Sequence, residues 1–98
     1  MTLTNKQQRF LRSMAHSLKP VIIIGNAGLS DGVINETDIT LETHELIKVK
    51  INAETREDRA EIREKLVQQT ESVLVQSIGH IAVLYRARKK NPDITLPH

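Results

Sequence analysis

The sequence predicts an α/β fold in which three helices pack on a four-stranded mixed sheet. Amphipathic stretches at helical spacing alternate with short apolar runs, a glycine-containing loop follows the first run, and only Gly79-His80 separates the last two runs. The expected order is therefore α-β-α-β-α-β-β. Each βαβ unit should cross over in the right-handed sense and make parallel neighbours, and the final hairpin should add one antiparallel strand.

Length and composition set further bounds. With 98 residues, the chain can form a single domain, which we expect at residues 1–90, followed by a tail at 91–98 whose order the sequence leaves open. The absence of Cys excludes disulfide bonds and Cys-ligated metals. No apolar stretch is long enough to span a membrane, and the first residues lack the apolar core of a signal peptide, so we expect a cytoplasmic protein.

The first predicted helix begins with a capping box and has two distinct sides. Thr4 and Gln7 have the required spacing, and the helix should run to about Leu18, before Lys19-Pro20 ends it. A helical wheel places Phe10, Leu11, Met14 and Leu18 on one side and Lys6, Arg9, Arg12 and His16 on the other. Because this helix has no acid, its basic side lacks the ion pairs that a purely solubilising face usually has.

The first two strands differ in pattern. Residues 21–24 form a continuous apolar run, which predicts a strand covered on both faces or at the centre of the sheet. Residues 45–51 alternate instead, with Ile47, Val49 and Ile51 toward one face and Leu46, Lys48 and Lys50 toward the other. Between these strands, Ser30 is a candidate N-cap for a second helix that should end near Glu42-Thr43.

A third helix and a hairpin complete the predicted fold. Thr55 with Asp58 starts a helix to about Thr70 whose outer side mixes both signs of charge, which is typical of a solvated scaffold. Residues 73–78 and 81–85 then form two strands joined by a two-residue turn with glycine first. The two aromatic residues, Phe10 and Tyr85, are expected in the core, which disfavours RNA binding by base stacking on exposed aromatics.

Charge is segregated along the chain, although the net charge is only +2. Residues 1–25 carry four basic side chains and no acid, and residues 79–91 carry four more and no acid. Residues 26–78 hold six basic and eleven acidic side chains. The two basic ends could form the electrostatic footprint for a polyanion, or they could simply be solvated.

The loop Gly25-Asn26-Ala27-Gly28 lies between the first apolar run and the second helix. Glycine lets backbone amides approach a bulky anion, and the start of a following helix adds partial positive charge, so the loop could face a phosphate. A strand-to-helix turn needs such residues even when nothing binds, so the turn-only interpretation also stands. Neither a Walker nor a Gly-x-Gly-x-x-Gly pattern follows, which excludes nucleotide cradles of those types.

No pattern of residues predicts catalysis, a cofactor or a metal site. The four histidines, His16, His44, His80 and His98, are not at a metal-ligand spacing, and no catalytic constellation can be argued from the carboxylates. We therefore expect neither an enzyme nor a small-molecule substrate. Any nucleic acid should be bound through its backbone, as by the Gly-x-x-Gly loop of KH domains, although that loop joins two helices and this one follows a strand.

Several motifs spaced along the chain occur together in one known family: Leu11-Arg12, Ala15-His16, Leu18-Lys19-Pro20, Gly25 to Leu29, residues 44–50, Ile78-Gly79 and Leu84-Tyr85-Arg86. Over residues 3–88 the chain resembles the CRM domain (chloroplast RNA splicing and ribosome maturation) in its stand-alone bacterial YhbY-type form. The resemblance implies a fold similar to the C-terminal domain of translation initiation factor three. It also implies a non-catalytic RNA-binding protein that associates with ribosomal RNA in precursors of the large subunit and assists ribosome assembly.

The same resemblance places RNA contacts at the Gly-x-x-Gly loop and the neighbouring basic surface. The predicted RNA-binding residues are Lys6, Arg9, Arg12, Lys19, Gly25, Asn26, Ala27, Gly28, Lys48, Lys50, Arg86 and Arg88. The cations of the first helix and Lys19 are expected near the loop, where Asn26 replaces the Lys or Arg that many members carry. Whether Lys48 and Lys50 face RNA or only solvent stays open.

The alternative is a protein-interaction adaptor on ribosomal particles. Such an adaptor would use an exposed sheet edge or apolar tail residues such as Ile94 and Leu96. In either case the balanced charge favours a monomer, with no membrane among its partners. The sequence does not say which RNA segment is bound, or whether the protein acts as a chaperone or a placeholder.

Overall fold

The chain folds into three helices and four strands in the predicted order. The computed structural model describes residues 2–98, so Met1 of the predicted domain lies outside the described residues. The elements are α1 (Asn5–Ala15), β1 (Pro20–Ile24), α2 (Asp31–His44), β2 (Leu46–Ile51), α3 (Arg56–Thr70), β3 (Val73–Ile78) and β4 (Ile81–Tyr85). Within residues 2–98, no helix combines the length and the apolarity needed to cross a membrane.

Each helix begins at the hydroxyl side chain that the sequence pattern indicates. The hydroxyls of Thr4, Ser30 and Thr55 accept the backbone N–H three residues further on, at 3.1, 3.2 and 3.0 Å. In α1 the capping box is complete, because the Gln7 side chain accepts the Thr4 backbone N–H at 3.0 Å. The predicted helix starts are thus confirmed, whereas α1 ends earlier than predicted, at Ala15.

The strand order is β1-β2-β4-β3, which differs from the prediction at one place. β1 and β2 are parallel neighbours as expected, but β4 lies between β2 and β3 and is antiparallel to both. The prediction that β2 and β3 are parallel neighbours was therefore wrong. The inner place goes to the more apolar hairpin strand: Ala82 to Tyr85 are all buried, whereas β3 leaves Ser77 and Ile78 exposed.

β1 is an edge strand with one open face, which corrects the prediction of a strand covered on both faces or at the sheet centre. Ile22 and Ile24 are buried, but Val21 is 51% and Ile23 64% exposed. A continuous apolar run does not distinguish these cases, because its periodicity is the same whether one face or both are covered.

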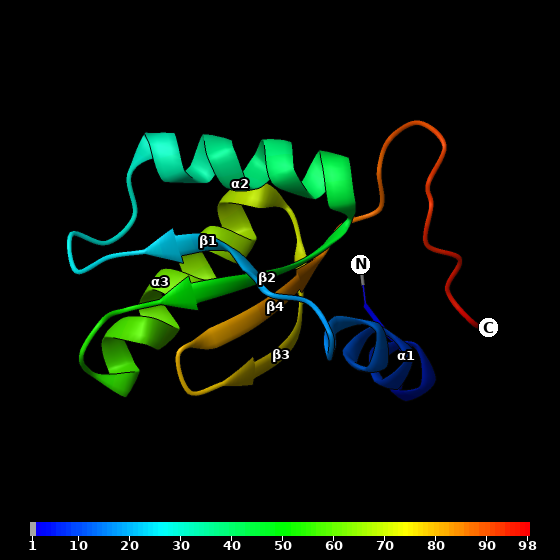
Figure 1. Cartoon of the computed structure of the whole chain (residues 1–98), viewed down its shortest axis with the longest axis horizontal. Helices are drawn as coiled ribbons and strands as arrows, with labels where there is room; N and C mark the ends of the chain where they lie inside the picture. Colours follow the sequence, from blue (N-terminus) through cyan, green and yellow to red (C-terminus); the bar gives the residue numbers. More distant parts are fainter. Residues whose placement is uncertain (1) are drawn as a thin grey trace.

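Helices cover the two faces of the sheet unequally (Figure 1). The larger core lies between the sheet and the helices α2 and α3, and includes Ile24, Leu41, Val49, Leu66 and Leu84. A smaller core lies under α1 on the opposite face and contains Leu11, Ala15, Leu46, Val75, Val83 and Tyr85. α1 sits at one end of the sheet in Figure 1, so the rest of this face has no helix over it.

The aromatic residues behave differently from one another. Tyr85 is buried in the smaller core as predicted. Phe10 is 37% exposed, and Met14 and Leu18 are exposed to a similar degree, so the prediction that Phe10 lies in the core was wrong. α1 contacts the sheet through Leu11 and Ala15, and the other apolar side chains flank that narrow contact line.

The C-terminal tail is held against the domain by the buried carboxylate of Glu45. One carboxylate oxygen accepts the backbone N–H groups of Asp93 and Ile94 at 2.8 and 2.9 Å, and the other accepts that of Arg88 at 2.8 Å. Ile94 and Leu96 pack on the smaller core beside α1, so these tail residues already have an apolar partner within the chain. This occupies one of the two surfaces that the adaptor alternative requires.

Candidate nucleic-acid interface

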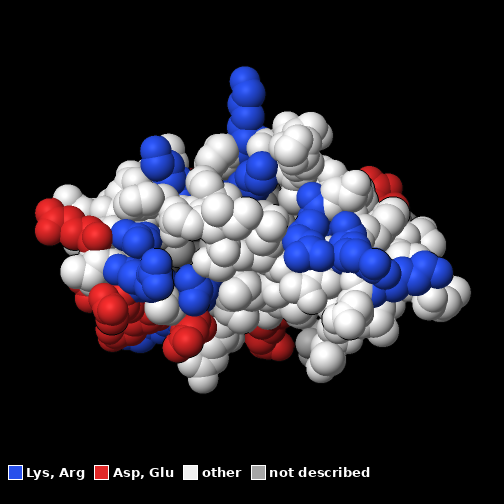
Figure 2. Space-filling model, turned by 90° about the horizontal axis from the view of Figure 1, so that it is seen from below, with Lys and Arg blue, Asp and Glu red and all other residues white. Residues whose placement is uncertain are grey.

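α1 presents basic side chains with no acidic neighbours of its own. Lys6, Arg9 and Arg12 are exposed, and within residues 2–98 no carboxylate forms an ion pair with them. Figure 2 shows blue side chains gathered at the end where α1 lies, whereas blue and red mix at the opposite end. The helix therefore offers positive charge that the fold does not use for its own stability.

Two lysines extend this positive charge along the open part of the sheet. Strand register pairs Lys48 with Val83 and Lys50 with Ile81, which puts both lysines on the face that α1 covers in part. Lys50 is exposed, while Lys48 is half-buried and its Nζ lies 3.5 Å from the His16 carbonyl, which accepts its hydrogen bond. Both lysines thus lie on the α1 face of the sheet, the side that carries the basic helix.

A groove of about 280 Å³ marks the junction of α1 with the open part of the sheet. It is lined by Arg12, Ala15, His16, Lys48, Gln76, Ile78, Ile81 and Val83. Its polar groups are two cations, one imidazole and one amide, and it contains no carboxylate. This composition fits an anion or a nucleotide better than a cation.

The glycine loop makes a tight turn at the far end of β1. Gly28 has φ +80°, and its backbone N–H donates to the Gly25 carbonyl at 3.0 Å, so this amide is already used. A Cβ added at Gly25 would have no heavy atom within 4 Å, so the backbone there is open to close approach. Gly25, Asn26 and Ala27 are all exposed.

The loop is not next to the cations of α1, which corrects the expectation that Arg9, Arg12 and Lys19 lie near it. β1 separates Lys19 from Gly25, which at strand spacing is about 20 Å. Figure 1 shows the loop and α1 at opposite ends of the sheet. Lys50 lies between them, because its register partner Ile23 is two residues before Gly25.

The other side of the loop is acidic. A hollow between the loop and α3 is lined by Asn26, Leu29, Ala53, Asp58, Glu61, Ile62 and Lys65. Two carboxylates against one ammonium group disfavour a phosphate on this side. A polyanion that touches the loop and the other predicted cations would therefore approach from the face that carries Lys48 and Lys50.

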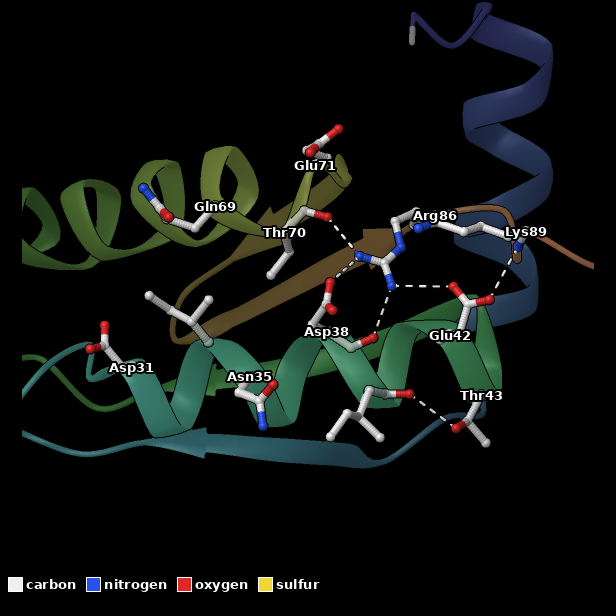
Figure 3. A pocket seen from close by; sticks show the side chains of 12 residues that line it. Asp31, Asn35, Asp38, Glu42, Thr43, Gln69, Thr70, Glu71, Arg86 and Lys89 are labelled. Carbon is white, nitrogen blue, oxygen red and sulfur yellow. Dashed lines mark hydrogen bonds and ion pairs between the residues drawn. The ribbon is translucent and has the colours of Figure 1, made fainter.

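Arg86 does not join these cations, because its guanidinium connects α2 to α3 (Figure 3). It forms ion pairs with Asp38 and Glu42, and it donates to the backbone carbonyls of Thr70 at 2.8 Å and Asp38 at 2.9 Å. The surrounding cavity, about 910 Å³, also contains the carboxylates of Asp31 and Glu71. We therefore leave Arg86 out of the candidate interface.

Arg88 is likewise used within the fold. Its side chain donates to the carbonyls of Glu42 at 3.2 Å and Thr43 at 2.7 Å, which are among the last carbonyls of α2. A guanidinium at a helix C-terminus satisfies unpaired carbonyls and complements the helix dipole. The basic C-terminal stretch is thus a structural device in its arginines, and the candidate interface loses this part of the predicted set.

The sequence analysis missed three features of this face. Ile23 and Ile78 are among the most exposed apolar side chains of the described chain, and His16 lines the groove beside Arg12. Ile78 stands next to the turn glycine, which is a weak signal of exposure at a strand end. Nothing in the run of residues 21–24 distinguishes Ile23 from its buried neighbours.

Comparison with known proteins identifies the family. A model of the CRS1 / YhbY (CRM) domain matches residues 3–86. The chain belongs to the CRM domain family. This CRM domain is 45% identical over 95 residues to a Bacillus subtilis protein named "Probable RNA-binding protein YqeI", covering 97% of this chain and 99% of that one.

Two further relatives resemble the CRM domain over nearly its full length. A Haemophilus influenzae protein named "RNA-binding protein" is 47% identical over 96 residues, covering 98% of this chain and 96% of that one. The solution structure of SAV1595 from Staphylococcus aureus has 45% sequence identity and a TM-score of 0.83, with 98% of this chain and 100% of the other covered. The fold of this CRM domain is therefore that of a solved relative.

Proposed function

We propose that the protein is a non-catalytic RNA-binding protein that contacts the RNA backbone through one face. This face consists of Lys6, Arg9, Arg12, Lys19, Lys48 and Lys50, with the glycine loop at its far end, and we call it the basic face. The observation that supports it is the set of exposed α1 cations without acidic partners, continued by two lysines on the same side of the sheet. The names of the two bacterial relatives support RNA as the polyanion.

We further propose that the RNA is ribosomal, in precursors of the large subunit, and that the protein acts in the cytoplasm as a monomer that assists assembly. The family resemblance supports this choice. Crosslinking in cells followed by sequencing of the bound RNA tests it, and the reads should concentrate in large-subunit RNA. Co-sedimentation with ribosomal particles that survives complete RNA digestion would instead support the adaptor alternative.

Binding through phosphates predicts a strong dependence on salt. Cations that neutralise phosphates release counterions, so the affinity should fall as salt rises. If the six cations of the basic face each contact a single-stranded phosphate, the plot of log Kd against log salt should have a slope of about 4. Fluorescence anisotropy of a labelled RNA between about 50 and 200 mM salt measures it. An affinity that does not change with salt would contradict the proposal.

Gly25→Val tests whether RNA approaches the loop backbone. Gly25 does not have a positive φ and the added side chain meets no neighbouring atom, so the melting temperature should stay within about 1–2 °C of the parent value. RNA affinity should fall about 5- to 10-fold, equivalent to about 1 kcal/mol, if phosphates come close to this backbone. Unchanged affinity in this folded variant would return the loop to a turn without a binding role.

A further inference from the structure

We propose that the open half of the α1 face of the sheet binds the bases of unpaired nucleotides, so that the protein prefers single-stranded RNA to duplex RNA. This rests on the proposed RNA-binding function and adds a statement about the kind of RNA. The region is the part of the sheet face that α1 leaves uncovered, and we call it the open face. It consists of Ile23, Lys48, Lys50, Gln76, Ile78 and Ile81.

Strand register arranges the open face in two rows across the sheet. One row reads Ile23, Lys50, Ile81 and Ile78, and the next reads Pro20, Lys48, Val83 and Gln76. Each row therefore has a lysine on β2 with apolar side chains beside it. Ile23 and Ile78, at the two ends of the first row, are 64% and 65% exposed.

The chemistry of these rows fits a nucleotide in both of its parts. Phosphates would contact the ammonium groups of Lys48 and Lys50, while the flat faces of bases would cover the isoleucines and remove apolar surface from water. Gln76 contributes an amide that can both donate and accept, as a base edge requires. The first row crosses four strands, about 14 Å at sheet spacing. Sheets of this width bind two or three unstacked bases in other RNA-binding modules.

Charge selects RNA over a protein partner. Neither row contains a carboxylate, and the cations of α1 border the same groove through Arg12. A duplex would use the lysines, but it presents phosphates and hydroxyls rather than base faces, so the isoleucines would stay in water. Only a strand with exposed bases satisfies the lysines and the isoleucines together.

The test compares two RNAs and two variants by fluorescence anisotropy. The RNAs are a 12-nucleotide strand without self-complementarity and the 12-base-pair duplex of the same sequence. We expect the full chain to bind the single strand at least 10-fold more tightly. The double variant Ile23→Ser/Ile78→Ser should lose about 10-fold in single-strand affinity and keep its duplex affinity. Because both side chains are exposed, the variant should keep the parent circular dichroism spectrum.

Ile39→Ser is the matched control, because Ile39 is 59% exposed but lies on α2 beside the acidic cavity. It should bind both RNAs as the parent does. Equal binding of the two RNAs, with no effect of the double variant, would overturn this inference and leave the RNA-binding function intact. No binding of either RNA would overturn the function itself. Self-association of the parent that the double variant abolishes, with unchanged RNA affinity, would show a protein interface and also overturn the inference.

Discussion

The double variant Arg9→Glu/Arg12→Glu is expected to bind RNA about 100-fold more weakly than the parent at about 0.1 M salt. Both arginines are exposed on α1, where the described chain supplies no carboxylate partner, so their charge is available to phosphates. The variant removes two phosphate contacts and adds two repulsive charges. Anisotropy titrations should also show that the slope of log Kd against log salt falls by about 2.

Arg56→Glu/Lys90→Glu is the control for net charge. It makes the same change in total charge with two exposed residues that lie outside the basic face. Arg56 is the first residue of α3, where an acid suits the helix dipole, so the control should fold. We expect less than about a 3-fold loss, which long-range charge alone could cause. Equal losses in the two double variants would mean that the protein attracts RNA by net charge and not by the basic face.

Glu45→Ala is expected to lower the free energy of unfolding by about 2–4 kcal/mol. Glu45 is fully buried, and its carboxylate accepts three backbone N–H groups from residues 88, 93 and 94. Without the carboxylate those donors lose their partners, and the tail that packs Ile94 and Leu96 on the smaller core is released. Chemical denaturation monitored by circular dichroism measures the loss, and proteolysis should cut the tail first.

Two companion variants separate the carboxylate from the backbone at this position. Glu45 has φ +65°, which costs a residue with a Cβ about 1 kcal/mol, so Glu45→Gly should be more stable than Glu45→Ala by about that amount. Glu45→Gln keeps an acceptor oxygen of the same reach and should lose less than Glu45→Ala. If all three variants match the parent in stability, the carboxylate does not secure the tail.

The pH dependence gives an independent measure of the same contact. Burial alone would raise the pKa of Glu45, but the three backbone donors and the nearby Arg88 outweigh it and hold the pKa below the ordinary value of 4.5. A carboxyl with a lowered pKa stabilises the fold at pH values above 4.5, and this contribution is lost as the pH falls through the folded-state pKa. The stability gap between the parent and Glu45→Gln should therefore narrow below pH 4.5.

Local patterns predicted the elements well because local forces set them. Caps at Thr4, Ser30 and Thr55 fix the helix starts, and the alternation of residues 46–51 assigns their side chains to the correct faces. The hairpin at Gly79 follows from a glycine with positive φ. Each of these signals lies within a few residues of the structure that it predicts.

Predictions that depended on distant contacts were less successful. The position of β4 between β2 and β3 depends on which strand buries more apolar surface, and the single covered face of β1 depends on where α1 ends. Arg86 and Arg88 read as free basic residues in the sequence, but α2 and the end of α3 supply carboxylates and carbonyls more than 15 residues away. A count of charge along the chain cannot detect such partners.

The sequence by itself determined the α/β class, the order of the elements, the cations of α1 and the family. The tertiary structure decided which cations remain available, because the fold pairs Arg86 and Arg88 internally and leaves Lys6, Arg9 and Arg12 in solvent. It also separated the glycine loop from α1 by the length of β1 and uncovered Ile23 and Ile78. Helix caps and periodicity act over a few residues, whereas burial and charge pairing depend on segments that only the folded chain brings together.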